Sequence, residues 1–457
     1  MNLQLLKEAC EGITWIEPAS SEYDEARHIY QLDHTAVPLA IVQPTTIDDV
    51  ALVVKSATQH GIKFTVRGGG HHIMGRCIEQ DTLTIDLRKL DSVEVASDRH
   101  TAVIGGGANN LQVARVLEKE GLATPLGLVA TVGFVGWATL GGYGSFMNQW
   151  GLGVDNIVGA KLVTWEGKII DANEEVLTGI RGAGGAFGII VSLTVKVHAL
   201  EKVLAGGMLF APQQFKPFLQ MLEKEASSFP PALQIGTAVF NFPGKGRVFR
   251  AELLWSSPDL EAGYEAIRRL KSLSPPAIVD DVSETALSTL IEKITAMIPP
   301  AYGGNETVSF GTFDDEALEI LDQCITAMPN DPATVMALHH LSPISPSART
   351  LSPQEDKRSS WPLHCGHTMI EIIGSVTDKT DKANKAKSRQ WSVESRDALR
   401  RSAKSLEETY ISMTYPGDRT LAQVYGSKWE NLKALSEKYD PHGVFELAVP
   451  RIRSGMA

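Results

Sequence analysis

Residues 64–75, FTVRGGGHHIMG, place three glycines directly before two histidines. Glycine opens backbone conformations closed to other residues and lets the chain approach a ligand closely, at a cost in backbone entropy. A neutral imidazole is both a nucleophile and a hydrogen-bonding group near pH 7. We therefore predict that Gly68 to Gly70 form a loop beside a large ligand and that His71 is presented to it.

Glycine is concentrated in four clusters, at 68–70, 105–107, 131–144 and 181–188. Backbone amides freed of side chains can cradle a pyrophosphate. None of the clusters fits the Rossmann fingerprint, and the chain has no P-loop motif. For one cluster alone, turns of a β-rich domain would be the simpler interpretation. Four clusters in one stretch, one of them next to two histidines, favour a large phosphate-bearing cofactor.

The composition bounds the partners. The chain has 457 residues, 43% of them hydrophobic and 21% charged, which is typical of a soluble globular protein. Its formal net charge is -11. Nucleic acid and anionic membranes call for a basic surface, so we expect neither as a partner. A small-molecule substrate is the expected ligand.

Two further features concern the compartment. Lys7, Glu8 and Glu11 interrupt the apolar stretch that a signal peptide needs, and no later stretch resembles a membrane-spanning helix, so we expect a cytoplasmic protein. The four cysteines lie far apart, without disulfide or metal-ligand spacing, so we expect reduced thiols and no metal. The sequon at Asn305 is then expected to be unmodified.

The chain divides by composition into three parts. Residues 36–200 combine glycine with short Val, Ile, Leu and Thr runs and helical patterns, which is typical of an α+β domain. In residues 203–415, strands such as 246–255 alternate with amphipathic helices such as 260–273, and the charged stretch 378–390 is interpreted as a solvated loop. The tail contains a helix that ends near Asp440 and Gly443.

The residues 38–72, 151–169 and 181–200, with the glycine clusters between them, together resemble the FAD-binding domain of the vanillyl-alcohol oxidase and p-cresol methylhydroxylase superfamily. Within it the chain is most similar to the berberine-bridge-enzyme-like branch. The stretch 424–445, which joins Tyr-Gly, a helix and Tyr-Asp-Pro, is similar to the C-terminal motif of that branch. The resemblance is weak between about 200 and 424.

The resemblance implies an α+β fold: a two-part FAD-binding domain of the p-cresol methylhydroxylase type beside an α/β substrate domain, whose antiparallel sheet is covered by helices. We predict the FAD-binding domain at 1–202 with its core at 36–200, the substrate domain at 203–415, and a segment at 416–457 that returns to the first domain.

The resemblance also implies a covalent cofactor. In this branch Arg-x-Gly-Gly-His supplies a histidine bonded to the flavin 8α carbon, and here that histidine is His71. His72 is expected to donate a hydrogen bond nearby. Several relatives carry a second bond through a cysteine, which is Val129 here, so we expect a single bond. Val132 is similar to members in which oxygen reaches the flavin, which favours an oxidase, although ordinary packing of a valine among glycines is an equal alternative. The implied cofactor-binding residues are Arg67, Gly68, Gly69, Gly70, His71, His72, Thr131, Val132, Gly133, Gly136, Gly141, Gly142, Asn156, Gly188 and Ile189.

The stretch 364–376 resembles the substrate-domain strand that faces the flavin in this branch. Glu371 occupies the position of an acid or base in several members, although an exposed strand glutamate is an equal alternative. His367 shares its strand face, because side chains alternate along a strand, and Tyr410 is a further candidate proton acceptor. Candidates for an aromatic pocket are Tyr143, Trp137, Trp361 and Tyr410.

Departures from the family pattern mark places where the site differs. Residues 446–450 replace the Asn and Gln that usually lie close to the flavin. The lead into the 181–188 cluster is shortened, and Trp137 stands where many relatives have His.

The resemblance implies an FAD-linked oxidoreductase. We expect an oxidase that removes hydride from a C-H next to an alcohol or amine of a small, secondary-metabolite-like substrate, with O2 as acceptor. The alternatives are a flavin-bearing cyclase or pericyclase without net redox change, and a binding protein that keeps the fold without the flavin. Fold-level likeness does not identify the substrate.

Overall fold

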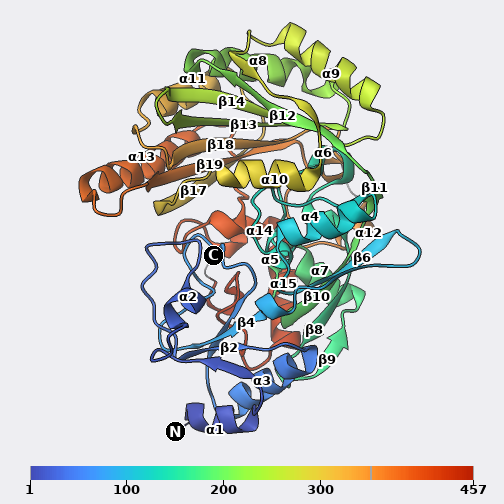
Figure 1. Ribbon diagram of the computed structural model, residues 1–457, viewed down its shortest axis with the longest axis vertical. Helices are drawn as coiled ribbons and strands as arrows, with labels where there is room; N and C mark the ends of the chain where they lie inside the picture. Colours follow the sequence, from blue (N-terminus) through green and yellow to red (C-terminus); the bar gives the residue numbers. More distant parts are fainter. Residues whose placement is uncertain (1, 350–351, 456–457) are drawn as a thin grey trace.

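The computed structural model describes residues 2–349 and 352–455. Figure 1 shows two lobes stacked along the long axis. The lower, N-terminal lobe contains a four-stranded and a five-stranded sheet and the short pair β7 (Leu122–Ala123) and β11 (His198–Ala199), and the upper, large-sheet lobe contains one extended sheet under a layer of helices. The mixed α+β class and the helix-covered antiparallel sheet are therefore confirmed.

The first sheet of the N-terminal lobe is mostly parallel. Its helix α3 (Ile47–Gln59) connects two parallel strands and begins at Thr46, whose side chain forms a capping box with Asp49. Val50, Val53 and Val54 follow at helical spacing and are buried against the sheet. The strand order is β1 (Thr14–Ile16), β2 (Ala40–Gln43), β4 (Leu83–Asp86) and β3 (Phe64–Arg67), with only β1 antiparallel to its neighbour.

The second sheet of this lobe is antiparallel and carries three of the four glycine clusters at its ends or on the helices beside it. Its strands lie in the order β5 (Val93–Val95), β6 (Thr101–Gly105), β10 (Ile189–Lys196), β8 (Ile157–Val163) and β9 (Ile169–Asp171). The helices around it are α4 (Asn110–Lys119), α5 (Phe134–Thr139) and α7 (Glu174–Ala183).

The large sheet is antiparallel throughout. Its main path runs β15 (Val279–Asp280), β12 (Val203–Phe210), β14 (Gly246–Trp255), β13 (Leu233–Phe242), β18 (Thr334–Leu341), β19 (His367–Val376) and β17 (Tyr302–Phe310), and β16 (Ser283–Thr285) pairs with β12. The helices α8 (Phe215–Glu225), α9 (Leu260–Leu273), α11 (Asp315–Thr326) and α13 (Lys382–Arg400) cover its upper face.

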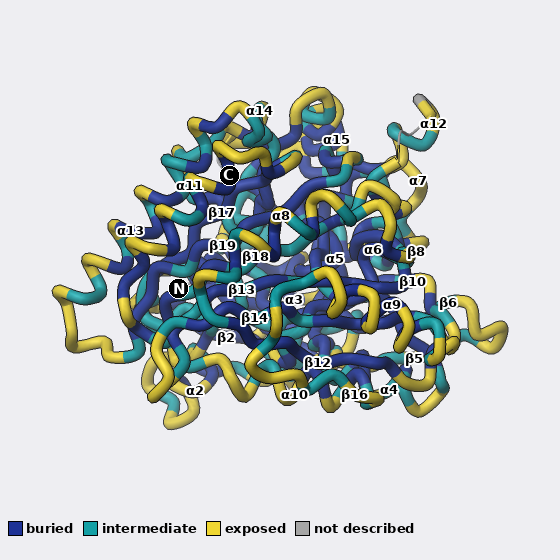
Figure 2. The backbone as a smooth tube through the Cα atoms, turned by 90° about the horizontal axis from the view of Figure 1, so that it is seen from above, coloured by how far each residue is buried: buried dark blue, intermediate teal, exposed yellow. Residues whose placement is uncertain are grey.

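The two faces of β19 have different partners. Ile370 and Ile372 join the core beneath the helices, whereas Met369 packs with residues of the N-terminal lobe and Glu371 shares its face. Figure 2 shows the central strands of this sheet as buried and the outer sides of the covering helices as exposed. The predicted alternation of the strand therefore holds, and it aims Glu371 at the N-terminal lobe.

The interpretation of 378–390 as a loop is wrong, because most of it belongs to α13. The helix begins after Asp381, whose side chain accepts a hydrogen bond from the backbone of Asn384. Lys382 and Lys387 on this helix are exposed, while Trp391 and Leu399 are buried on the sheet. Further along, Arg396 and Arg400 are largely buried and form ion pairs. The high charge of this stretch is that of an exposed helix face.

Two segments cross between the lobes. Helix α10 (Leu287–Ala296) belongs to the predicted substrate domain, yet Leu287, Leu290 and Ile291 are buried in the core around α4. Helices α14 (Leu421–Tyr425) and α15 (Trp429–Tyr439) pack against α7 and the glycines beside it. Helix α10 therefore belongs to one predicted domain by sequence and to the core of the other by packing. The predicted domain boundaries at 202 and 415 stay predictions.

Candidate active site

The four glycine clusters and the inner face of the large sheet enclose one cavity of about 390 Å³. Its walls come from both lobes: the loop 68–77 and residues 184–190 on one side, Asn305, Glu371 and Tyr410 on the other. A ligand that fills this cavity contacts residues of both lobes. The cavity is therefore a site for a ligand held between the lobes.

The glycine clusters build the N-terminal wall from backbone. A Cβ added to Gly69 would lie 2.1 Å from the backbone nitrogen of Gly133, so the two loops pack without room for side chains. Gly70 has a φ of +76°, which disfavours other residues. A Cβ on Gly136, by contrast, would meet no atom within 4 Å and would project into open space. This wall can hold a ligand against its main chain.

Most of the cofactor-binding residues predicted from the sequence line this cavity, and five do not. Ten of them line the cavity: Gly68, Gly69, Gly70, His71, His72, Val132, Gly133, Gly136, Gly188 and Ile189. Thr131 contacts it through His71. Arg67 lies behind the wall, where its buried guanidinium donates hydrogen bonds to the carbonyls of Ala26 and His28.

Three residues predicted to bind the cofactor, Gly141, Gly142 and Asn156, do not line the cavity, and their contact with the cofactor stays a prediction. Gly141 (φ +128°) allows close packing of Trp361, which would lie 2.7 Å from an added Cβ, and Gly142 packs on Gly153. Asn156 donates to the carbonyls of Trp150 and Leu152 at 3.0 and 2.9 Å. These three residues pack against other protein segments next to the wall. Sequence likeness alone does not distinguish such residues from those that line the cavity.

His71 is held as a neutral imidazole. Its ring stacks on Tyr30 with centroids 4.7 Å apart, and its Nε2 lies 2.7 Å from the Thr131 hydroxyl. Burial, with a smaller contribution from Arg67, lowers the pKa of His71 to about 4. At pH 7 the imidazole is therefore uncharged and can act as a nucleophile.

A cationic corner lies beside the cavity: His72 and Arg76 line the cavity, and Arg451 lies close enough to lower the pKa of both. Three buried nitrogens have no hydrogen-bond partner among the described residues: His72 Nε2, Arg76 Nη1 and Arg451 Nε. Glu79, paired with Arg451, is the carboxylate acting on Arg76. Burial and then Arg451 lower the pKa of Arg76 to about 10, and burial with the two arginines lowers that of His72 to about 3.

This corner is short of negative charge, because the buried Arg76 and the partly buried Arg451 face the single carboxylate of Glu79. The diphosphate of FAD brings negative charge and many acceptors, so the residues present fit that cofactor. Arg76 and Arg451 were not predicted from the sequence. Arg76 follows the glycine–histidine loop by four residues, and that position is the signal that could have identified it.

The opposite wall carries the groups that can exchange protons. The side chain of Glu371 is 16% exposed and lines the cavity, so the alternative of a solvent-exposed strand glutamate is wrong. Burial, with a contribution from Glu371, raises the pKa of Tyr30 and of Tyr410 to about 12. Both phenols stay protonated at pH 7, which leaves Glu371 as the acceptor on this wall.

His367 is not placed to accept a proton from a ligand in this cavity. It shares the strand face of Glu371 but does not line the cavity. Its Nε2 lies 2.5 Å from the Tyr143 hydroxyl and its Nδ1 lies 2.8 Å from the carbonyl oxygen of Cys365. Both ring nitrogens have partners and burial lowers its pKa to about 4, so the structure does not favour His367 as a proton acceptor, and that role stays a prediction.

The aromatic candidates form a box behind Tyr410. The ring of Tyr143 meets that of Tyr410 edge-on at 5.2 Å, and Trp361 lies 5.9 Å from Tyr143. Neither Tyr143 nor Trp361 lines the cavity, whereas Trp137 and Tyr410 do. The box thus fixes the position of Tyr410.

The departure at 446–450 has a clear structural counterpart. Leu447, Ala448 and Val449 line the cavity, so an apolar surface replaces the polar contact common in the family. Glu446 faces away and pairs with Lys63 at 2.7 Å on the surface. Val129 and Val132 also line the cavity and extend this apolar surface.

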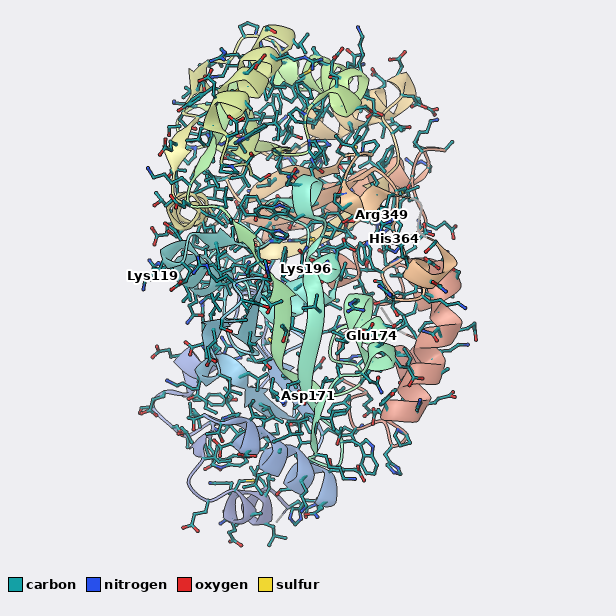
Figure 3. The ribbon with its side chains drawn as sticks, turned by 90° about the vertical axis from the view of Figure 1, so that its right-hand side faces the viewer. Lys119, Asp171, Glu174, Lys196, Arg349 and His364 are labelled. Carbon is teal, nitrogen blue, oxygen red and sulfur yellow. The ribbon has the colours of Figure 1, made fainter. Side chains whose placement is uncertain are left out.

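A larger hollow of about 1260 Å³ lies on another side of the molecule. Figure 3 shows Lys196, Glu174, Arg349 and His364 on that side, from segments of both lobes. All four line the hollow, whose walls carry both charge signs. It is not built by the glycine clusters, and the smaller cavity remains the candidate active site.

Comparisons with known proteins agree with this geometry. A family model described as an FAD binding domain matches residues 38–173. The chain is 31% identical to the FAD-linked oxidoreductase aurO of Gibberella zeae, over 98% of this chain and 88% of that protein. It is 35% identical to (R)-6-hydroxynicotine oxidase of Paenarthrobacter nicotinovorans, over 43% of this chain and 44% of that protein.

A likeness in fold extends over nearly the whole chain. The glucooligosaccharide oxidase of Acremonium strictum, which carries a 6-S-cysteinyl, 8α-N1-histidyl FAD, has a TM-score of 0.83 at 18% identity, with 97% of each chain covered. The fold and the site thus define an FAD-binding flavoprotein. The chain belongs to the FAD-linked oxidoreductases of the berberine-bridge-enzyme-like branch, and that prediction is confirmed. No described helix has the length and apolar character to cross a membrane.

Proposed function

We propose that the protein is an oxidase that converts a small alcohol or amine to the carbonyl or imine and passes the electrons to O2. In the net reaction a CH–XH group, where X is oxygen or nitrogen, loses two hydrogens to O2 and becomes C=X, with hydrogen peroxide as the second product. The observation that carries the proposal is the pair of neutral His71 and the cavity-facing carboxylate of Glu371, on opposite walls of one cavity.

The roles of the chain's own residues follow from their chemistry. FAD, when bound, supplies the acceptor for a hydride. Glu371 takes the proton of the substrate heteroatom, because the neighbouring phenols of Tyr30 and Tyr410 are already protonated. Those phenols can donate hydrogen bonds that orient the same heteroatom.

The cofactor attachment is proposed to use His71 alone. Its Nε2 is engaged by Thr131, which leaves Nδ1 as the nitrogen free to form a bond to the flavin. The glucooligosaccharide oxidase has a cysteinyl bond as well. Val129 has no sulfur and lines the cavity at the position where the family's cysteine is expected, so one bond is proposed.

The character of the wall supports a compact and largely apolar substrate. The cavity lining that contains Glu371 also includes Ile73, Ile298 and Met413 and the rings of Tyr30, Trp137 and Tyr410. An oligosaccharide would present many hydroxyls to this surface and leave them without partners. A compact molecule with a single hydroxyl or amine suits this surface. The similar (R)-6-hydroxynicotine oxidase is named for a substrate of that size.

The proposal is tested by anaerobic mixing of the holoenzyme with a panel of aromatic alcohols and cyclic amines. An oxidase bleaches its flavin absorbance with at least one member, and air restores the absorbance with one equivalent of hydrogen peroxide. Conversion of a panel member with no bleaching would instead support the cyclase, which the acid and base groups of Tyr410 and Glu371 could also serve. Bleaching that air fails to reverse would replace the oxidase by a dehydrogenase.

A further inference from the structure

The environment of Glu371 contains one polar contact that the proposed function does not use. The side-chain amide nitrogen of Asn305 donates a hydrogen bond of 2.9 Å to Oε1 of Glu371. Asn305 is 5% exposed and lines the same cavity. The asparagine that belongs to a glycosylation sequon is thus part of the cavity wall.

Strand register brings the two side chains together. In the antiparallel pair β17 and β19, Thr307 lies opposite Glu371 and Asn305 lies opposite Ile373. Asn305 and Glu371 are therefore diagonal neighbours on one face, a spacing that polar side chains can bridge. The strands fix both backbones, so the hydrogen bond selects one orientation of the carboxylate.

The other charged and titratable groups around Glu371 leave this task to Asn305. His339, on the neighbouring strand β18, lies 3.8 Å from Oε2, beyond hydrogen-bond distance. Tyr30 and Tyr410 act on Glu371 from the remaining sides and stay protonated. Asn305 holds Oε1 at every pH, because an amide does not titrate.

We propose that Asn305 is a positioning residue for Glu371: its amide anchors Oε1 and leaves Oε2 as the oxygen that receives the substrate proton. The inference rests on the proposed function for its consequence in turnover. The contact itself can be tested without a substrate. A donor to the charged form stabilises that form, so its loss makes the carboxylate easier to protonate.

The experiment is a titration of Glu371 by NMR in protein labelled with [δ-13C]glutamate. The signal of Glu371 is the one absent from the Glu371→Gln protein. In Asn305→Ala the midpoint of this titration should rise by about one pH unit, the scale of one charge-assisted hydrogen bond. In Asn305→Asp it should rise further, because two adjacent carboxyl groups share one proton.

Asn241→Asp provides a matched control. Asn241 is 4% exposed in the same sheet, but its amide donates to the carbonyls of Pro329 and Asp331. The control should leave the Glu371 midpoint unchanged, and retained FAD absorbance reports that each protein is folded. If Asn305→Asp does not fold, Asn305→Ala decides.

A Glu371 midpoint in Asn305→Ala equal to that of the wild type would overturn the positioning role. This outcome is separate from the fate of the proposed function. An active Glu371→Gln protein would remove the base from the mechanism and leave the titration result standing, while a wild-type midpoint in the variant would leave the base in place.

Discussion

The two walls of the cavity are built by different means. The N-terminal wall is backbone: the loops at Gly69 and Gly133 touch so closely that no Cβ fits between them. The wall of the large sheet is side chain: Asn305 and Glu371 come from strands 66 residues apart in sequence and meet through strand register. The N-terminal wall serves FAD, which is the same cofactor throughout the family. The wall of the large sheet can carry different side chains in relatives with different substrates, because its backbone does not depend on them.

The largest effect is expected on the backbone wall. His71→Ala removes the nucleophile for cofactor attachment and should convert bound FAD from acid-stable to fully releasable. Denaturation in acid followed by centrifugation measures this: the yellow colour stays with the wild-type pellet and moves to the supernatant of the variant. Release from His72→Ala alone would instead assign the bond to His72.

The opposite wall should respond in rate with the cofactor left in place. Glu371→Gln keeps the shape and removes the proton acceptor, so substrate-driven flavin bleaching should slow by roughly 100-fold or more. Stopped-flow reduction measures it with any panel substrate that bleaches the wild type. Glu446→Gln, which changes a surface carboxylate paired with Lys63, is the control and should keep the wild-type rate. Wild-type bleaching by Glu371→Gln across pH would point to Tyr410 as the proton acceptor.

The cationic corner should affect cofactor affinity without affecting the bond to His71. In the His71→Ala background FAD binds reversibly, and adding Arg76→Leu should weaken it by ~10-fold to 100-fold, the scale of a charge-assisted hydrogen bond. Quenching of flavin fluorescence measures both dissociation constants. Arg115→Leu, at an exposed arginine that pairs with Glu292, should leave the affinity unchanged. Equal losses in the two double variants would remove Arg76 from the FAD site.

The same contrast explains what could be predicted from sequence. The loop 68–72 is contiguous, so its residue types favoured a large phosphate-bearing cofactor, and the family resemblance then implied FAD and a role for His71. Alternation along β19 indicated the face of Glu371. Asn305 and Arg451 could not be found in this way, because each meets its partner through packing between distant segments. Gly141 and Asn156 match the motif equally well, yet they support the wall from behind, and only packing distinguishes the two positions.

The smallest expected effect concerns stability against acid, and His340 is the residue that isolates it. His340 is half-buried in the large sheet outside the cofactor cavity, with its ring nitrogens 3.0 Å from the Thr237 hydroxyl and 2.9 Å from that of Thr368. Burial, with a smaller contribution from His339, lowers its pKa to about 3, whereas an unfolded histidine titrates near pH 6.5. Between these values the unfolded chain binds a proton that the folded chain does not, so stability falls as the pH drops from about 6.5 toward 3.

At pH 5 this difference amounts to about 2 kcal/mol. His340→Gln keeps hydrogen-bonding groups and removes the titration, so its melting temperature should fall less than that of the wild type between pH 7 and pH 5. The exposed His100 gives the matched control His100→Gln, whose pH dependence should follow the wild type. Parallel curves for wild type and His340→Gln would mean that His340 is protonated in the folded protein. Because His71, the proposed attachment residue, lies in the other lobe, both variants should remain yellow, and the acid sensitivity of the large sheet can then be separated from loss of the cofactor.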